Sequence, residues 1–344
     1  MSSSWDCIDL RLDYAAGRVL DGFDKVVVTG GLGFVGQTLV RALTAQGKDV
    51  IVIDDGPGPQ DGLPPGATLI HADITDAHHV TRASAGADLF FHLAANSSGT
   101  LSVVNPRYDF ETNALGTFNV LEAALTVGAR RFVYVSSASV YGTPQRFPMD
   151  EQHPTRPFVP YGASKLSGEV LSFALSHAFG LPVVAARPFC VYGPGENPRY
   201  ALVEVARFLR WHLNDRLIQI VGDLDHKTRD FVHVDDLVAG LLLIADRAPS
   251  GEVFNVGSGQ EISMRQLVTT IGDVTGTQPQ IELLPHITED TYRLVADISK
   301  LQALGFQPNV SLEEGIRNLA ADLGPAPALP AGSTIFSRDQ QAER

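Results

Sequence analysis

Residues 25–36 read Lys-Val-Val-Val-Thr-Gly-Gly-Leu-Gly-Phe-Val-Gly, and this stretch decides the fold. The β-branched run Val26–Thr29 predicts a strand that is covered on both faces of its sheet. Gly30, Gly33 and Gly36 follow at the spacing of a tight turn from a strand into a helix. Glycine lets the backbone approach a phosphate closely, and the free N–H groups at the start of the helix can bind that phosphate. The stretch therefore predicts a dinucleotide site on the first unit of a parallel sheet.

Outward from this stretch, short apolar strands alternate with longer amphipathic segments. Right-handed crossovers between such strands build a doubly wound parallel sheet, so the predicted fold class is α/β and Rossmann-like, with a smaller α/β C-terminal lobe. The expected strands are Lys25–Thr29, Val50–Ile53, Thr68–His71, Leu89–Leu93, Arg131–Val135, Val183–Ala186, Ile218–Val221 and Glu252–Val256. The expected helices are Gly33–Gln46, Phe110–Thr126, Tyr161–His177, Ala201–Leu213, Asp236–Asp246, Met264–Val274 and Leu312–Leu323.

The alternation of strand and helix patterns also predicts the domains. This alternation is interrupted after Arg187, where a Gly- and Pro-rich segment follows, and again at a Pro- and Ala-rich C-terminal stretch. The expected parts are an N-terminal extension (1–24), an NAD-binding Rossmann domain (25–187, with elements around 228–258 returning to it), a substrate-binding lobe (188–227 and 259–323) and a flexible tail (324–344).

Composition and charge exclude several functions. The chain of 344 residues has 26 Lys and Arg against 39 Asp and Glu, a formal net charge of −13. Such a surface repels phosphate backbones and anionic lipids, so neither a nucleic acid nor a membrane is an expected partner. The longest apolar run, Leu237–Ala245, is well short of the roughly 20 residues of a membrane helix. Cys7, Cys190 and the pair His78–His79 lack metal-site spacing, so we expect no metal and a reducing cytoplasm.

Acidic residues at strand ends indicate which dinucleotide binds. Asp54 ends the second strand, where a carboxylate can accept from the adenosine ribose and repel a 2′-phosphate, which favours NAD over NADP. Asp55 either helps in this or is a solvated turn residue. Asp73, after the third strand, either accepts from the adenine or caps the next helix. The small residues Ala94 and Ala95 would let the cofactor lie against the backbone of the fourth strand end.

Tyr161 and Lys165 are four residues apart, so a helix places them on one face. A free tyrosine has a pKa of about 10, too high for a general base. A neighbouring ammonium and the positive nicotinamide of NAD⁺ both favour the phenolate and are expected to lower that pKa. Ser137 is the hydroxyl expected to relay a proton to Tyr161, with Ser139 as second choice. Ser136 either contacts the cofactor or only satisfies the backbone.

Seven motifs now combine: TGGLGFVG, FHLAA, SSASVYG, YGASK, RPFCVYGPG, TRDFVHVDD and VFNVGSG, in this order between Lys25 and Leu323. Together they resemble the extended short-chain dehydrogenase/reductases, the NAD-dependent epimerase/dehydratase family. The resemblance implies tightly bound NAD, a nucleotide-sugar substrate and a homodimer built from two helices of the cofactor domain. The predicted cofactor contacts are Gly30, Gly33, Phe34, Val35, Gly36, Asp54, Asp55, Asp73, Ile74, Leu93, Ala94, Ala95, Ser136, Tyr161, Lys165 and Pro188.

The residues after Ser137 indicate the reaction. Family dehydratases carry Asp-Glu where this chain has Ala138-Ser139, and the UDP-glucuronate decarboxylases carry Glu at Ser139. Those reactions need a carboxyl group to move a proton on the sugar, for which a serine hydroxyl is too weak. The resemblance therefore implies a 4-epimerase. Tyr161 would take the proton of the C4 hydroxyl while NAD⁺ takes the C4 hydride, and the 4-keto sugar would take the hydride back on its other face.

Basic residues in the second half indicate the rest of the substrate. Arg229 and Arg293 match family arginines that clamp a pyrophosphate, for which the forked guanidinium is suited. Arg229 could instead pair with Asp230 or Asp235. The predicted substrate contacts are Ser137, Ser139, Tyr161, Cys190, Arg199, Gln219, Val221, Arg229 and Arg293, with Gln219 and Val221 flanking a uracil.

Cys190 stands where the family usually has a substrate-contacting Asn. UDP-glucuronate 4-epimerases also replace that Asn, commonly with Thr, and continue with an arginine that binds the sugar carboxylate. Asn197 aligns with that arginine, but Arg199 lies two residues further on and could replace it, unless it is only solvated on a loop. We therefore expect UDP-glucuronate as substrate. The alternatives are UDP-glucose or UDP-N-acetylglucosamine epimerisation, another nucleotide-sugar dehydratase or reductase, and a non-catalytic NAD sensor.

Overall fold

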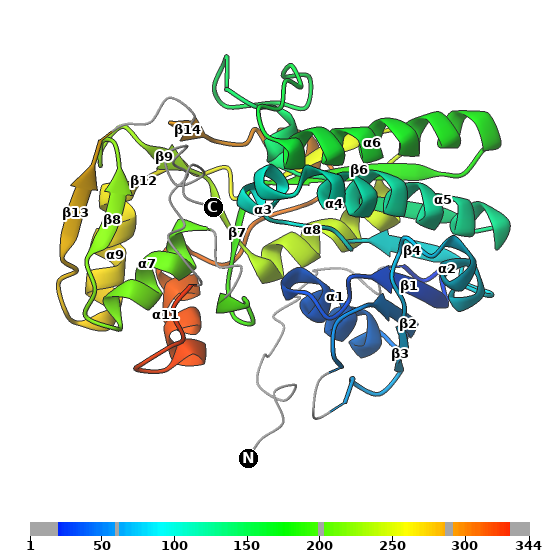
Figure 1. Ribbon diagram of the computed structural model, residues 1–344, viewed down its shortest axis with the longest axis horizontal. Helices are drawn as coiled ribbons and strands as arrows, with labels where there is room; N and C mark the ends of the chain where they lie inside the picture. Colours follow the sequence, from blue (N-terminus) through cyan, green and yellow to red (C-terminus); the bar gives the residue numbers. More distant parts are fainter. Residues whose placement is uncertain (1–19, 59–61, 199–202, 286–291, 331–344) are drawn as a thin grey trace.

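A parallel sheet of seven strands forms the centre of the molecule (Figure 1). The computed structural model describes residues 20–58, 62–198, 203–285 and 292–330. The strand order is β11-β6-β5-β4-β1-β2-β3, so the chain winds from β1 to β3 and then crosses to the other side of β1 with β4. Such a switch opens a crevice for ligands at the carboxyl ends of β1 and β4. The strands are β1 (Lys25–Thr29), β2 (Asp49–Asp54), β3 (Ala67–His71), β4 (Leu89–His92), β5 (Arg131–Val135), β6 (Val183–Pro188) and β11 (Val253–Val256).

Alternate residues of these strands pack into two apolar cores, one on each face of the sheet. In β1, Val26 and Val28 belong to one core and Val27 to the other, and all three are fully buried. Each buried valine side chain contributes about 1.5 to 3 kcal/mol, so the run is apolar throughout. Helices on both faces confirm the predicted Rossmann-like α/β class. They are α1 (Phe34–Ala45) and α8 (Val234–Arg247) on the first face, and α2 (Ala77–Ala83), α5 (Gly116–Thr126) and α6 (Pro160–Phe179) on the second.

The segment between β4 and β5 differs from the prediction of one helix over Phe110–Thr126. The chain forms α3 (Gly99–Val104) and α4 (Pro106–Phe110), passes through a π-helical turn, η1 (Glu111–Leu115), and only then enters α5. The turn brings Gly116 close to the segment that follows β3. A Cβ on Gly116 would lie 2.5 Å from Ile74 Cδ1. Single π-helical turns are frequent next to functional sites.

A lobe of smaller elements follows β6 and lies at the left of Figure 1. It has its own apolar core, to which Phe208, Leu267 and Ile316 contribute. Its short strands escaped prediction because two or three residues carry no periodic pattern. The elements of the lobe and its junction are β7 (Cys190–Tyr192), α7 (Glu204–His212), β8 (Ile218–Val221), β9 (Thr228–Arg229), β10 (Phe231–His233), β12 (Ile262–Ser263), α9 (Met264–Thr275), β13 (Ile281–Leu284), β14 (Arg293–Leu294) and α11 (Leu312–Leu323). The short helix α10 (Ser299–Gln302) packs instead against β11 of the central sheet.

Three small sheets hold the lobe and its junction together. β8 pairs with β13, β7 pairs with β10, and β9 lies between β12 and β14. The expected helix start at Ala201 lies outside the described residues. Within the described ranges, no helix is long and apolar enough to span a bilayer, and no cluster of His, Cys, Asp and Glu could hold a metal ion.

Candidate active site

The glycine loop after β1 packs directly against the end of β4. Gly30 has a φ of 72°, and a Cβ there would lie 2.6 Å from the backbone nitrogen of Ala94. Helix α1 starts at Phe34 with Gly33 as its N-cap, and no side chain of the described part of the chain caps it. The first N–H groups of α1 thus remain available as donors. Because the glycines of the loop have no side chain, a pyrophosphate can approach these N–H groups closely. The loop fits the predicted dinucleotide.

Asp54 braces this loop. Its Oδ2 accepts from Leu32 N at 2.9 Å and its Oδ1 from Gly56 N at 2.9 Å. A carboxylate has about four lone-pair sites, so acceptor capacity remains for the hydroxyls of a ribose. Asp55 is exposed.

The second reading of Asp73, as a helix cap, is wrong. Asp73 is exposed, and its Oδ1 accepts from Thr75 N at 2.8 Å, which closes a local turn. The cap of α2 is Asp76, whose side chain accepts from His79 N at 3.0 Å. The reason is spacing, because a cap must lie two or three residues before its donor and next to the first helical residue.

Ser136 has a buried hydroxyl group that indicates a ligand contact. It is buried at the end of β5, and its Oγ has no hydrogen-bond partner in the described ranges. The alternative that this hydroxyl only satisfies the backbone is therefore wrong. A buried hydroxyl without a partner costs free energy, which favours a ligand contact there. The other predicted cofactor contacts are half-buried (Phe34, Val35, Leu93, Ala94, Ala95) or buried (Ile74, Pro188).

Ser137 and Tyr161 are brought together as the sequence predicts. The Ser137 hydroxyl lies close enough to the Tyr161 phenol, in the first turn of α6, to lower the pKa of that phenol. Ser137 Oγ also lies 3.2 Å from Ser139 Oγ and accepts from Ser139 N at 3.1 Å. The two serines are thus hydrogen bonded to each other at the carboxyl end of β5, beside Tyr161.

Lys165 is buried one helical turn further along α6. Its Nζ lies 4.7 Å from the centroid of the Tyr134 ring, and the Tyr134 hydroxyl donates to Lys165 O at 3.0 Å. Burial lowers the pKa of Lys165 to about 7, while the charges of Asp109 and Glu169 raise it. The ammonium is therefore held between an aromatic face and two carboxylates.

The pKa of Tyr161 differs from the expectation of a lowered value. Removal of the phenol from water raises this pKa, the neighbouring Ser137 hydroxyl lowers it, and the charge of Asp109 raises it. The prediction considered Lys165 and NAD⁺ but not burial or a nearby carboxylate. The protein's own groups therefore do not create a phenolate at neutral pH.

Sequence reasoning missed a buried polar network behind Tyr161 and Lys165. His92 Nδ1 lies 2.6 Å from Thr29 Oγ1, and its Nε2 lies 2.9 Å from Thr117 Oγ1. The Thr117 hydroxyl donates to Asn113 O at 2.6 Å. Burial and the charge of Lys165 lower the pKa of His92 to about 3, so its ring is neutral. The signal for this network in the sequence was that polar residues, Thr29, His92 and Thr117, stand within segments that are otherwise apolar.

A buried ion pair supports the other side of α6. Arg187 Nε donates to Glu169 Oε2 at 3.1 Å, its Nη2 donates to Glu169 Oε1, and its guanidinium lies 4.7 Å from the Tyr141 ring centroid. This pair ties α6 to β6. Arg187 also donates to Glu151 O at 3.2 Å, which fixes the loop after Tyr141.

The predicted substrate contacts are spread over the junction and the lobe. Cys190 is half-buried on β7, and burial together with Glu204 raises its thiol pKa, which excludes a nucleophilic role at neutral pH. Gln219 Nε2 donates to Glu282 Oε2 at 2.9 Å, and Val221 is buried on the same strand. Arg199 lies outside the described residues.

Arg229 pairs with a carboxylate that the sequence did not suggest. Its Nε lies 3.3 Å from Glu204 Oε1, and its Nη1 donates to Thr228 O at 2.9 Å. The predicted alternative partners were Asp230 and Asp235, and this alternative is wrong. Asp230 accepts instead from backbone and hydroxyl groups of the segment 258–259 and from Ala296 N.

Arg293 is engaged separately. It forms two hydrogen bonds of 2.7 Å with Glu261, and its guanidinium lies 4.1 Å from the Phe147 ring centroid. Arg293 is in register with Thr228, so the side chains of Arg229 and Arg293 leave opposite faces of the small sheet. In this structure the two predicted pyrophosphate arginines bind different carboxylates, Glu204 and Glu261.

The fold and the Ser137–Tyr161–Lys165 arrangement define a class of protein. Residues 26–257 match the model of the NAD dependent epimerase/dehydratase family, and the chain belongs to this family. The predictions of the family, of an enzyme and of NAD as its cofactor are confirmed.

The relatives narrow the class. A UDP-glucose 4-epimerase of Mycolicibacterium smegmatis is 37% identical over 301 residues, 85% of this chain and 96% of the relative. The UDP-glucose 4-epimerase of Thermotoga maritima, solved with UDP-glucose, is 32% identical over 87% of this chain and 98% of its own, with a TM-score of 0.82. A UDP-glucuronic acid 4-epimerase of Bacillus cereus, solved with UDP-glucuronic acid and NAD, is 29% identical over 87% and 98%, with a TM-score of 0.79. The chain is therefore an isomerase of the NAD-dependent nucleotide-sugar 4-epimerase group.

Proposed function

We propose that the protein inverts C4 of a UDP-sugar, with UDP-glucuronate as the substrate. The observation that carries the 4-epimerase reaction is the approach of the Ser137 hydroxyl to the Tyr161 phenol, one helical turn from the buried side chain of Lys165. The neighbouring residues Ala138 and Ser139 carry no carboxyl group, which disfavours elimination and decarboxylation because both move a proton at carbon.

The residues of the site have separate roles. The first N–H groups of α1, Asp54 and Ser136 would hold NAD, which supplies a hydride acceptor and a positive charge beside the phenol. Ser137 orients the C4 hydroxyl and passes its proton to Tyr161. Lys165 would donate to the nicotinamide ribose and would stabilise the phenolate form of Tyr161. Tyr161 returns the proton when the sugar is reduced on its other face.

The reaction is tested with the protein as purified and without added NAD. UDP-sugar is incubated with the protein, and the products are separated by anion-exchange chromatography. We expect the C4 epimer to form with no net NADH absorbance, and Tyr161→Phe to reduce the rate about 100-fold or more. Accumulation of free NADH, or a product that has lost water or carbon dioxide, would overturn the epimerase proposal.

The identity of the sugar rests on Cys190 and on Arg199, which would bind the C6 carboxylate. One observation favours the second candidate, UDP-glucose: it is the substrate named for the Mycolicibacterium smegmatis and Thermotoga maritima relatives. The two candidates are separated by kcat/KM for UDP-glucuronate, UDP-glucose and UDP-N-acetylglucosamine. We expect Arg199→Ala to weaken UDP-glucuronate selectively. Equal weakening of all three sugars would exclude the carboxylate contact.

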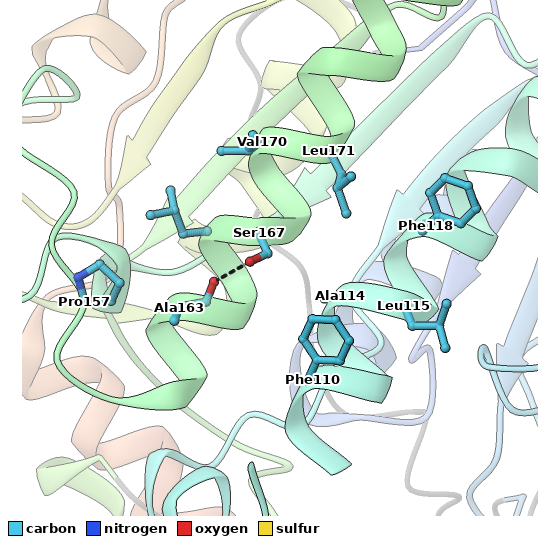
Figure 2. Close-up of a pocket in the computed structure, with 10 residues that line it drawn as sticks. Phe110, Ala114, Leu115, Phe118, Pro157, Ala163, Ser167, Val170 and Leu171 are labelled. Atoms are coloured by element: carbon cyan, nitrogen blue, oxygen red, sulfur yellow. Dashed lines mark hydrogen bonds between the residues drawn. The ribbon is translucent and has the colours of Figure 1, made fainter. Parts of the chain in front are cut away.

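We also propose a homodimer, in which a second copy of this chain covers an apolar groove between α5 and α6. Figure 2 shows the groove, which has a volume of about 670 Å³ and is lined by Phe110, Leu115, Phe118 and Val170 among others. Phe110 and Val170 are each 59% exposed. Contiguous apolar surface of this kind marks an interface, and a two-fold axis would bury the same helices of both copies.

A further inference from the structure

Asp109 is a buried carboxylate that the proposed reaction does not use. It stands in the last turn of α4 and is 1% exposed. Its Oδ1 accepts from Asn96 Nδ2 at 2.8 Å and from Asn113 Nδ2 at 3.1 Å. Its Oδ2 is buried without a hydrogen-bond partner in the part of the chain that the structure describes. Burying a charge with half its acceptor capacity unused costs free energy, so a packing role alone does not account for it.

The bonds of Asp109 lead to α6. Asn113 Nδ2 also lies within hydrogen-bond distance of Ser164 Oγ, at 3.0 Å, and Ser164 Oγ donates to Tyr161 O at 3.0 Å. Asn96 N donates to Asn113 Oδ1 at 2.8 Å, which ties the end of β4 to the same amide. Asp109 therefore anchors the start of α6, where Tyr161 stands in the first turn and Lys165 one turn further on.

The charge of Asp109 acts on the same turn. The groups that act on Lys165 are the charges of Glu169 on α6 and Asp109 on α4, the Tyr134 ring of β5, and His92 of β4. The Glu169 carboxylate is committed to the Arg187 guanidinium. The ion pairs of the described residues include none for Asp109. Asp109 and Glu169 raise the pKa of Lys165 against the effect of burial, and of these two carboxylates Asp109 is the one that no guanidinium offsets.

We propose that Asp109 is a positioning residue, which fixes the first turn of α6 through Asn113 and holds Lys165 as an ammonium. The inference rests on the proposed function, in which Lys165 must be charged to stabilise the Tyr161 phenolate. Its chemical content is independent of turnover, because the protonation of Lys165 can be measured directly.

The decisive variant is Asp109→Asn in the NAD-loaded protein. The amide oxygen can still accept from Asn96 and Asn113, and the new NH₂ takes the place of the unpartnered oxygen, so the charge is removed with the anchor retained. We expect the midpoint of Lys165 titration to fall by about one pH unit or more. The measurement is the ¹³C shift of lysine Cε in labelled protein, with the Lys165 signal assigned through Lys165→Met.

Kinetics supply a second readout. In Asp109→Asn, the alkaline limb of the pH profile of kcat is expected to move to lower pH, because the ammonium is lost earlier. Asp109→Ala removes the anchor as well and is expected to lower the thermal midpoint further. The control is Asp236→Asn, which neutralises another buried carboxylate on α8 and is expected to leave the Lys165 midpoint unchanged.

The outcomes separate the inference from the proposed function. An unchanged Lys165 midpoint in Asp109→Asn would overturn the inference even if the protein epimerises UDP-sugars. A uniform loss of kcat without movement of the pH profile would reduce Asp109 to a structural residue. A shifted midpoint in a protein that turns over no UDP-sugar would support the inference and refute the proposed function.

Discussion

Tyr161 is the proposed acid and base of the reaction, yet its immediate surroundings in the protein oppose its ionisation. Burial and the charge of Asp109 raise its pKa, and the neighbouring Ser137 hydroxyl lowers it. Lys165 is itself depressed to a pKa of about 7 by burial. The two groups are therefore poised so that an added positive charge beside the phenol has a large effect, since neither is screened by water.

Gly30 offers a test of the dinucleotide site at the scale of one residue. Gly30→Ala places a Cβ 2.6 Å from Ala94 N. It also puts a side chain on a residue whose φ is 72°, a backbone angle that residues other than glycine rarely adopt. We expect a cost of about 1 to 3 kcal/mol in stability and a loss of bound NAD. The measurements are the thermal midpoint and the NAD released on denaturation. Gly47→Ala is the matched control, because it has a φ of 78° with no atom near the added Cβ. Equal NAD content in both variants would contradict the assignment.

Glu196 predicts a pH dependence of stability. Burial raises its pKa from 4.5 to about 8, against the lowering effect of Arg210 and Arg207. A carboxyl whose pKa is raised on folding holds its proton more tightly when folded, so stability is lost as pH rises from about 4.5 to about 8. Glu196→Gln is expected to become progressively more stable than the parent over this range, by at most about 1.4 kcal/mol per pH unit. Urea unfolding at several pH values checks this, with the exposed Glu122→Gln as control. Parallel curves would contradict it.

At the scale of elements, the features that could be predicted from the sequence depend on local patterns. The features that could not be predicted depend on contacts between residues far apart in the chain. The strand β1, the glycine turn and the spacing of Tyr161 and Lys165 depend on local patterns, so they were predictable. The π-helical turn at Glu111–Leu115 depends on the close approach of Gly116 to Ile74, which no local pattern records. The partners of Arg229 and Arg293 likewise come from distant elements, and a single sequence does not state them.

The exposed apolar groove between α5 and α6 leads us to expect a homodimer. Val170 is one of the α6 residues that line the groove of Figure 2 and is 59% exposed, so a second copy packed there would bury it. Val170→Glu places a charge in that interface and is expected to convert a dimer to a monomer with little change in the fold. Sedimentation velocity measures the state. Val104→Glu, on α3 and 62% exposed, is the control, since Val104 does not line the groove. A parent protein that sediments as a monomer would refute the homodimer.

At the scale of the whole molecule, the sheet and the lobe are joined through a few buried polar residues. Asn255 of β11 is fully buried and accepts from the Tyr141 hydroxyl at 2.6 Å. Its Nδ2 donates to Met149 O at 2.8 Å and to Asp297 O at 3.3 Å. Met149 N in turn donates to Val295 O, beyond β14. One side chain thus connects the central sheet, the loop after β5 and the strand that returns from the lobe.

Asn255→Leu, which keeps the volume and removes these bonds, tests whether that connection makes unfolding cooperative. Tyr141 Oη and Met149 O would each be left buried without this partner, at about 1 to 3 kcal/mol apiece. We expect the parent to unfold in a single calorimetric transition and the variant to unfold at a lower temperature, with the lobe separating as an earlier transition. Asn309→Leu, whose backbone rather than side chain bonds Asp236, is the control and should keep one transition. A single transition for Asn255→Leu, shifted or not, would mean that the two parts are coupled chiefly through their apolar contacts.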